Sequence, residues 1–515
     1  MIIKEHSVRM DDGVSLATDV YLPDEGDSYP ALLIMTPYGR KTKKIFAEMF
    51  VPRGYALVVQ DVRGRYDSEG EFKPIEQEKK DGPKTIDWII KQNWFDDNKG
   101  IGIVGISYLS TCAFPAIAKK DEIKTMINIG GFSDLYELTH RGGALVLHHA
   151  LPWSIITSYS PQPDLSKIDW DEVYSTVPLK DAASKAGYPN EIWDTYCEHP
   201  ERDGFWDDAS VEEFLPEVDI PILHMSGWYD LCLGPTVDLF EYFSENSDQP
   251  QHLVIGPWTH NSVLRGGKVL HGVDFGDESR PGIIENILNW FDRWLKGKEA
   301  VDGFSTEEKN VSLFLIGEGR WIHDMEKSEE MDLYFSNKGL VQEIPGGEKK
   351  VEYFIEEPVP TVGGRIWEFP DAGLEPGPAD QSELYDRNDV LLFTTEPLKE
   401  PFTVVGDVVC ELDINTTDKG SDLCVKLVDI DEEGRARFVG DGVKRMGSSG
   451  IHRVDLWWVA HTFKEGHKIG VEIAGSNFPQ WSLSPSLMEE GKDEYSINIG
   501  KENGSMLILP ISDEV

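Results

Sequence analysis

Short apolar runs alternate with longer amphipathic stretches over the first 135 residues of the chain. Two runs of strand length, at 31–35 and 55–59, are bounded by turn residues, as buried parallel strands are. The stretch 81–91 places its apolar residues at helical spacing, and strand-like runs follow at 101–105 and 123–129. This order of elements predicts a parallel sheet with crossover helices.

The pattern changes twice further along the chain. From about residue 135 to residue 215, short helical stretches, prolines and irregularly spaced aromatic residues replace the strand signal, which predicts an inserted helical cap. Strand-like runs return at 220–225 and 252–255, and 283–295 is a strongly amphipathic helix. After residue 303, short β-rich runs alternate with Gly, Pro, Asn and Asp turns, as in a β-sandwich or jelly roll.

The length and the net charge of the chain limit the kinds of protein it can be. The 515 residues are too many for one core, so two or three domains are expected. The 92 acidic and 49 basic residues give a net charge of −43, which argues against nucleic acid or an anionic membrane as a partner. The N-terminus lacks the pattern of a signal peptide and no apolar run has the length of a membrane span, so a cytoplasmic protein is expected.

The cysteines give no sign of a metal or disulfide framework. Five of them are scattered singly, without metal-ligand spacing, as in a reduced cytosolic protein. We therefore predict no metal and no organic cofactor. A homo-oligomer is compatible with these features.

Ser107 lies where a nucleophile would be expected. It follows the strand-like run 101–105 and precedes an apolar, helix-like run at 111–118. A strand, a tight turn with a glycine (Gly105) two residues before the serine, and a helix are the context of a nucleophile elbow. Such a turn presents the hydroxyl above the sheet and directs the first N–H groups of the helix towards an oxyanion.

An acid and a histidine follow in the order that an α/β-hydrolase uses. Asp230 comes just after the strand-like run 220–225, and His260 comes just after 252–255. Both therefore lie at the strand ends where open α/β sheets bind ligands. His260 would accept the Ser107 proton, and Asp230 would orient the imidazole.

Other acids and histidines fit this pattern less well. Asp61 also follows a strand, but it precedes Ser107 in the chain, and Arg63 nearby offers it a structural ion pair. We interpret Asp61 as a residue that stabilises the fold. The remaining candidate histidines lack a preceding buried strand; they are His140, His148, His149 and His271.

An oxyanion hole needs two donors. The backbone N–H of Tyr108, directly after the nucleophile, supplies the first. Tyr38, in the loop after the first predicted strand, offers a phenol O–H as the second, although a packing role fits its spacing equally well. In the cap, aromatic residues are expected mainly in its core, and Cys232 borders the expected substrate pocket.

The chain resembles the CocE/NonD family of serine hydrolases, the group of cocaine esterase and the Xaa-Pro dipeptidyl-peptidases. Similar motifs occur along nearly the whole chain, at 37–38, 60–64, 68–72, 105–109, 227–230, 256–260 and 463–467. The resemblance implies that Ser107, Asp230 and His260 form the triad and that Tyr38 and the Tyr108 N–H form the oxyanion hole. It also implies a pocket position for Trp153. One departure is Ser110, where the family usually has glycine.

The resemblance and the element pattern together predict an α/β protein in three parts. Residues 1–135 and 216–302 form an α/β-hydrolase catalytic domain, residues 136–215 form a helical cap insert, and residues 303–515 form a C-terminal all-β jelly roll. The predicted function is hydrolysis of a small-molecule carboxylic ester through an acyl-enzyme.

Two alternatives stay open at this point. One is an amide-bond hydrolase of the same family, such as an Xaa-Pro dipeptidyl peptidase, an α-amino-ester hydrolase or an acylase. The other is a catalytically silent binding protein that uses the jelly roll as a carbohydrate module.

Overall fold

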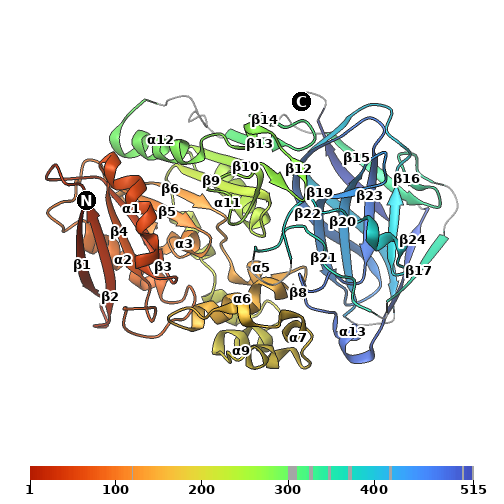
Figure 1. The fold of residues 1–515 in the computed structure, drawn as a ribbon, viewed down its shortest axis with the longest axis horizontal. Coiled ribbons are helices and arrows are strands. Elements are labelled where there is room, and N and C mark those ends of the chain that lie inside the picture. The colour runs from red at the N-terminus through yellow and green to blue at the C-terminus, as the bar shows by residue number, and fades with distance from the viewer. Residues whose placement is uncertain are drawn as a thin grey trace.

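The protein combines an α/β-hydrolase domain, a helical insert and a C-terminal β-sandwich, as the sequence predicts (Figure 1). The insert lies below the α/β domain in this view, and the sandwich lies at the right. The computed structural model describes residues 1–118, 120–299, 310–323, 329–345, 349–355, 357–368, 374–416, 420–500 and 504–512.

The catalytic domain is built on one sheet in the order β1-β2-β4-β3-β5-β6-β9-β10-β13-β14. Neighbouring strands from β4 to β13 run parallel, whereas β1, β2 and β14 are antiparallel to their neighbours at the two edges. The strands span Ile2–Arg9, Ser15–Leu22, Ala31–Thr36 (β3), Ala56–Asp61 (β4), Ile101–Ile106 (β5), Ile123–Ile129 (β6), Ile222–Tyr229 (β9), Gln251–Thr259 (β10), Asn310–Leu315 (β13) and Arg320–Ile322 (β14).

Helices cover both faces of this sheet. Apolar residues of α1 and α12 pack on one face, and those of α2, α4 and α11 pack on the other. The central strands are consequently buried on both sides, which explains their continuous apolar runs. The helices are Lys44–Phe50 (α1), Glu78–Ile89 (α2), Tyr108–Thr111 (α3), Phe114–Ile117 (α4), Leu233–Asn246 (α11) and Ile283–Lys296 (α12).

The helix predicted after Ser107 is two short helices, α3 and α4. They are separated at Cys112 and Ala113, and Pro115 lies in the first turn of α4. Proline is tolerated in a first helical turn but not inside a helix, because it has no backbone N–H to donate. The proline therefore accounts for the break.

The helical insert has a core of aromatic side chains. Trp170, Trp193, Tyr196 and Trp206 are almost fully buried, as expected for a cap that must pack on itself. A two-stranded ribbon, β7 and β8, precedes its longest helix. The elements are Leu135–Thr139 (α5), His140–Arg141 (β7), Ala144–Leu145 (β8), Leu147–Ser158 (α6), Trp170–Tyr174 (α7), Ala182–Lys185 (α8), Glu191–Glu198 (α9) and Gly204–Asp208 (α10).

The C-terminal part is a sandwich of a seven-stranded and a four-stranded antiparallel sheet. The larger sheet contains β15 (Glu329–Ser336), β16 (Gly339–Val341), β17 (Lys349–Ile355), β19 (Phe402–Thr416), β22 (Gly450–Phe463), β24 (Asp493–Ile499) and β25 (Met506–Ile511). The smaller contains β18 (Val390–Thr394), β20 (Asp422–Ile430), β21 (Ala436–Arg445) and β23 (Lys468–Ala474). Helix α13 (Pro485–Glu490) and the ribbon of β11 (Val269–Leu270) and β12 (Val273–Asp274) complete the described α-helices and strands.

The first sheet continues past the boundary predicted at residue 302. Strand β13 pairs in parallel with β10 from His252 to Ile255, and β14 folds back on β13. These two strands were expected to belong to the jelly roll. The apolar runs look alike in either domain, so only the pairing partner distinguishes them.

The predicted partner of Asp61 is also different in the structure. Arg40, not Arg63, forms a buried ion pair with Asp61, with 2.7 Å between Arg40 Nη1 and Asp61 Oδ2. Arg63 instead pairs with Asp12 and Asp81. Arg40 follows strand β3 and Asp61 ends the adjacent β4, so the sheet brings them together across 21 residues of sequence.

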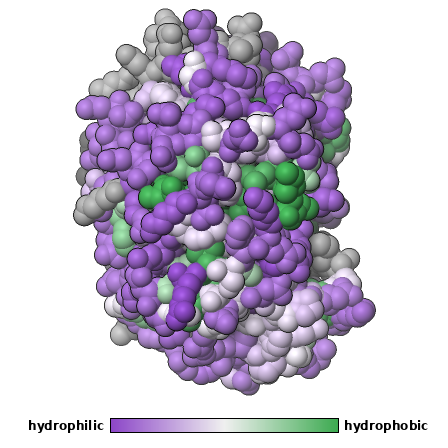
Figure 2. Space-filling model, turned by 90° about the vertical axis from the view of Figure 1, so that its left-hand side faces the viewer, coloured by the Kyte–Doolittle hydropathy of each residue, from purple (hydrophilic) through white to green (hydrophobic). Residues whose placement is uncertain are grey.

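The surface at the β1–β2 end of the molecule is polar. Figure 2 shows that the face at the β1–β2 end of the molecule is mostly hydrophilic, with small separate hydrophobic patches. None of the helices in the described part of the chain combines the length and apolar character that a bilayer crossing requires.

Candidate active site

Ser107 occupies a strained turn between β5 and α3. Its φ of 56° and ψ of −130° lie outside the regions that L-residues prefer, as is typical of a nucleophile elbow. The turn is held by its backbone, because Ser107 N donates to Ile129 O on β6 at 2.7 Å and Ser110 N donates to Ser107 O at 2.8 Å. Ser107 is partly exposed, whereas the next residue, Tyr108, is buried.

Ser110 fits where the family usually has glycine because the glycines lie on the opposite side of the contact. A Cβ on Gly105 would come within 2.8 Å of Ser110 Cα, and one on Gly131 would come within 2.7 Å of Ser110 Cβ. Helix α3 therefore packs closely against two glycine backbones.

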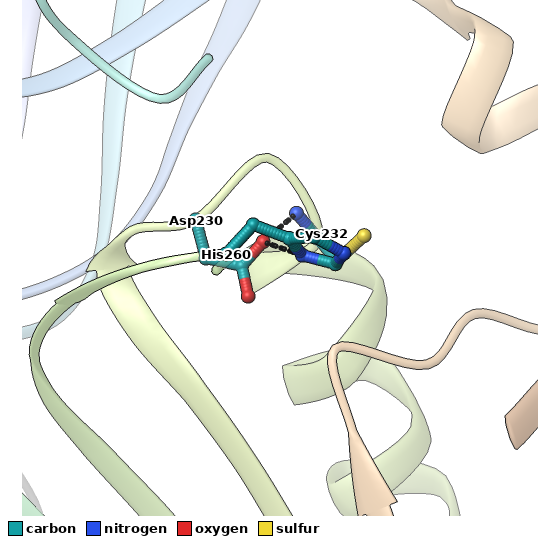
Figure 3. Close-up of side chains that lie close together, drawn as sticks. All are labelled: Asp230, Cys232 and His260. Atoms are coloured by element: carbon teal, nitrogen blue, oxygen red, sulfur yellow. Dashed lines mark hydrogen bonds and ion pairs between the residues drawn. The ribbon is translucent and has the colours of Figure 1, made fainter. Parts of the chain in front are cut away.

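Asp230 and His260 form a hydrogen-bonded pair beyond the ends of β9 and β10. His260 Nδ1 lies 2.8 Å from Asp230 Oδ1 (Figure 3). Asp230 is fully buried and also accepts hydrogen bonds from the Ser226 hydroxyl at 3.0 Å and from the backbone N–H of Cys232 at 2.8 Å. Three hydrogen bonds therefore fix the position of the Asp230 carboxylate.

The electrostatics favour an imidazole that can take up a proton. Burial alone would lower the pKa of His260, but the Asp230 carboxylate and then the Cys232 side chain outweigh it and raise that pKa well above 6.5. A carboxylate that stabilises the imidazolium is what a general base beside a serine requires.

Gly130 joins the nucleophile to this pair. Its neighbour Ile129 accepts the Ser107 hydrogen bond, and a Cβ on Gly130 would lie 3.1 Å from His260 Cε1 and 3.3 Å from Asp230 Oδ2. Gly130 also has a φ of 58°, a conformation that glycine adopts readily. The Ser107 turn and the Asp230–His260 pair therefore both adjoin the Ile129–Gly130 segment at the carboxyl end of the sheet.

Tyr38 presents its hydroxyl to Trp153 of the cap. Trp153 Nε1 donates to Tyr38 Oη at 2.9 Å, which leaves the phenol proton available to another acceptor. Burial raises the pKa of Tyr38, so the hydroxyl remains protonated at neutral pH. Trp153 also packs against the ring of Tyr108, with 5.6 Å between ring centroids.

The side chain of Tyr108 is fixed by hydrogen bonds to Glu78 and Ile75. Its hydroxyl donates to Glu78 Oε1 and accepts from Ile75 N, both at 2.8 Å. Its backbone N–H lies in the first turn of α3, where N–H groups have no helical acceptor.

The C-terminal domain contributes residues that the sequence did not suggest. Glu368 accepts the backbone N–H of Asn261 at 2.7 Å and a hydrogen bond from the hydroxyl of Thr259, so it holds both neighbours of His260. Trp367 packs edge-to-face on His149, with ring centroids 5.4 Å apart. Burial, and then the charge of His260, lowers the pKa of His149 to about 3.

The sandwich is anchored beside the same site. Buried Arg365 donates to Trp228 O near the end of β9 and to Trp458 O of β22. The cap meets the sandwich where His148 N donates to Pro479 O at 3.0 Å. No sequence motif could have revealed these contacts, because each joins segments more than 90 residues apart in the sequence.

A cleft of about 660 Å³ lies between the cap and the loop after β4. Its lining does not include the triad residues, but Phe72 in its wall packs against Tyr108 with ring centroids 6.1 Å apart. Other aromatic residues in the wall are Tyr159, Tyr196 and Phe205. The side chain of Phe72 therefore connects the cleft with the turn at Ser107 and Tyr108.

Comparison with known proteins identifies the family. The chain is 30% identical to cocaine esterase from Rhodococcus sp. (strain MB1 Bresler), over 98% of this chain and 97% of that protein. The chain belongs to the CocE/NonD family of serine hydrolases. As a member of the CocE/NonD family, the protein is a hydrolase of the serine type.

Two further comparisons agree with this assignment. Residues 12–262 match the model of the X-Pro dipeptidyl-peptidase S15 family, and residues 323–497 match the X-Pro dipeptidyl-peptidase C-terminal non-catalytic domain. An aminopeptidase from the marine sediment archaeon Thaumarchaeota archaeon has the same fold, with a TM-score of 0.86 and 22% identity over 99% of this chain and 96% of that chain. An α-amino acid ester hydrolase also has this fold, with a TM-score of 0.84 and 23% identity over 99% of this chain and 96% of that chain.

Proposed function

We propose that the protein hydrolyses carboxylic esters through an acyl-enzyme formed on Ser107. The observation that supports this most directly is the 2.8 Å hydrogen bond between Asp230 and His260 beside the strained Ser107 turn. Similarity over the full length to an esterase favours an ester over other acyl substrates.

The reaction proceeds in two acyl transfers. Ser107 Oγ attacks the ester carbonyl while His260 accepts the hydroxyl proton, and Asp230 stabilises the imidazolium. The negative charge that forms on the carbonyl oxygen is stabilised by the Tyr108 N–H and the Tyr38 hydroxyl. His260 then returns the proton to the departing alkoxide, and the alcohol leaves. Water attacks the acyl-enzyme by the same route, which releases the acid and restores Ser107.

The aromatic cleft is the proposed site for the part of the substrate that extends beyond the ester. Phe72, Tyr159, Tyr196 and Phe205 offer apolar ring faces, while Glu71 and Glu191 give its wall negative charge. Apolar surfaces with a few polar groups are typical of small-molecule sites.

Amide hydrolysis by the same residues is the second candidate, because the matching family model is that of a dipeptidyl-peptidase. The two candidates differ only in the leaving group. An amine leaving group must be protonated as it departs. A panel of p-nitrophenyl esters, amino-acid esters and Xaa-Pro anilides separates them by their kcat/KM values.

The test of the catalytic assignment is Ser107→Ala. We expect its kcat for p-nitrophenyl butyrate to fall by at least about a thousandfold, because the nucleophile is lost. Ser110→Ala, which removes a buried hydroxyl three residues away, is the matched control and should keep most of the activity. A fluorophosphonate should label the wild type once, at Ser107. Equal rates for the wild type and Ser107→Ala would refute the proposal.

A further inference from the structure

Cys232 places a thiol against the general base. The residue immediately precedes α11, and its backbone N–H donates to the same Asp230 oxygen that His260 contacts. Its sulfur lies beside the His260 ring in Figure 3, within 4.8 Å of an imidazole nitrogen. The turn that positions the acid therefore also positions the thiol.

Three different metal-ligand types meet at this point. One carboxylate oxygen of Asp230, one imidazole nitrogen of His260 and the Cys232 sulfur all lie within 4.8 Å of one another. Among the residues that the structure describes, no other group of three or more such side chains brings its donor atoms this close. The other cysteines are not in such a group, so the arrangement is particular to Cys232.

The donor set suits a thiophilic divalent cation. Zinc binds sulfur, nitrogen and oxygen ligands at about 2.0–2.3 Å in a tetrahedron, so the donor atoms of a filled site lie about 3.5 Å apart. The side chains would have to draw together by about 1 Å, which rotation of the cysteine side chain and tilting of the imidazole ring allow. His260 retains 12% exposure of its side chain, so the fourth position is open to water.

We propose that Cys232, His260 and Asp230 form a binding site for Zn²⁺, and that an ion bound there blocks hydrolysis. The proposal rests on the role of His260 in the proposed function. When the ion binds, metal–sulfur and metal–nitrogen bonds replace bonds from the ion to water. The S–H bond breaks and its proton passes to water, and a proton on the coordinated imidazole nitrogen moves to water or to the other ring nitrogen; nothing is oxidised or reduced. The imidazole lone pair is then bound to the ion, so His260 cannot accept the Ser107 proton.

Direct binding is tested in protein that cannot turn over substrate and that carries no polyhistidine tag. Cd²⁺, a spectroscopic substitute for zinc, is titrated into Ser107→Ala, and thiolate-to-metal absorption in the ultraviolet is measured. We expect one equivalent of Cd²⁺ to produce the band. The band should be lost in Ser107→Ala/Cys232→Ser and retained in Ser107→Ala/Cys197→Ser, whose altered cysteine is the partly exposed one. A band that is absent, or that survives Cys232→Ser, overturns the proposal.

Inhibition is tested separately with the active enzyme. Zn²⁺ should inhibit ester hydrolysis by the wild type and by Cys197→Ser at similar concentrations, and EDTA should restore the rate. Cys232→Ser should need at least about ten times more Zn²⁺ for half-inhibition, because even the loss of an outer partner of a metal ligand costs that much affinity. Equal inhibition of the wild type and Cys232→Ser would refute the blocking role. Because Cd²⁺ absorption needs no turnover, a failure of the proposed esterase function would not mimic a failure of the metal site.

Discussion

Glu78 should make the stability of the catalytic domain depend on pH around neutrality. This carboxyl begins α2, is 3% exposed and accepts the hydroxyl of Tyr108 through Oε1. Its second oxygen is buried and has no hydrogen-bond partner. Burial is the main cause that raises the pKa of Glu78 from 4.5 to about 7, against the opposing effect of the Tyr108 hydrogen bond.

The size and sign of the effect follow from this shift. Each pKa unit is worth 1.36 kcal/mol, so a rise from 4.5 to about 7 corresponds to about 3 kcal/mol. Between these two values the folded protein binds a proton that the unfolded chain has released. The free energy of unfolding therefore falls as the pH rises through this window, and the loss is complete above about pH 7.

The test compares urea unfolding of the wild type and Glu78→Gln at pH 5 and pH 8. The many other acidic residues contribute equally to both proteins, so their effects cancel in the difference. We expect Glu78→Gln to gain about 2 to 3 kcal/mol relative to the wild type between pH 5 and pH 8. Glu76→Gln changes an exposed carboxylate two residues away and should show no such gain. Parallel pH profiles for the wild type and Glu78→Gln would refute the reasoning.

Two substitutions near Ser107 test the positioning of the residues proposed to act with it. Trp153→Phe removes the N–H that bonds Tyr38 but keeps an aromatic ring against Tyr108, so kcat for p-nitrophenyl butyrate should fall about fivefold with KM little changed. An unchanged kcat would exclude a role for that hydrogen bond. Gly130→Ala places a methyl group 3.1 Å from His260 Cε1 and should lower kcat about ten- to a hundredfold, with the circular dichroism spectrum unchanged; full activity would contradict the tight packing there.

Local patterns predicted the parts of the site that depend on single strand ends. Ser107, Asp230 and His260 each follow a buried apolar strand, and the order of these strands in the sheet brings their ends together. The sequence therefore contained enough to select these residues among many acids and histidines. The structure adds the hydrogen bond that joins two of them.

Contacts between distant segments could not be predicted in the same way. The predicted ion pair of Asp61 was wrong. Arg63 is close to Asp61 in the sequence, but the pairing of β3 with β4 brings Arg40 next to it. His149 was set aside because no strand precedes it, yet it packs against Trp153 of the cap and Trp367 of the C-terminal domain, and the charge of His260 affects its pKa. The edge strands β1 and β2 were not predicted, because β1 is mostly exposed and has no apolar alternation to indicate it.

The hydrogen bonds that Glu368 accepts extend the proposed catalytic site into the C-terminal domain. Both neighbours of His260 are hydrogen-bonded to a side chain that lies more than 100 residues later in the sequence, outside the ten-stranded sheet that contains β5. The β-sandwich therefore contributes directly to the position of His260. Replacing it with the sandwich of a relative would preserve the general base only if the loop bearing this carboxylate were transferred with it.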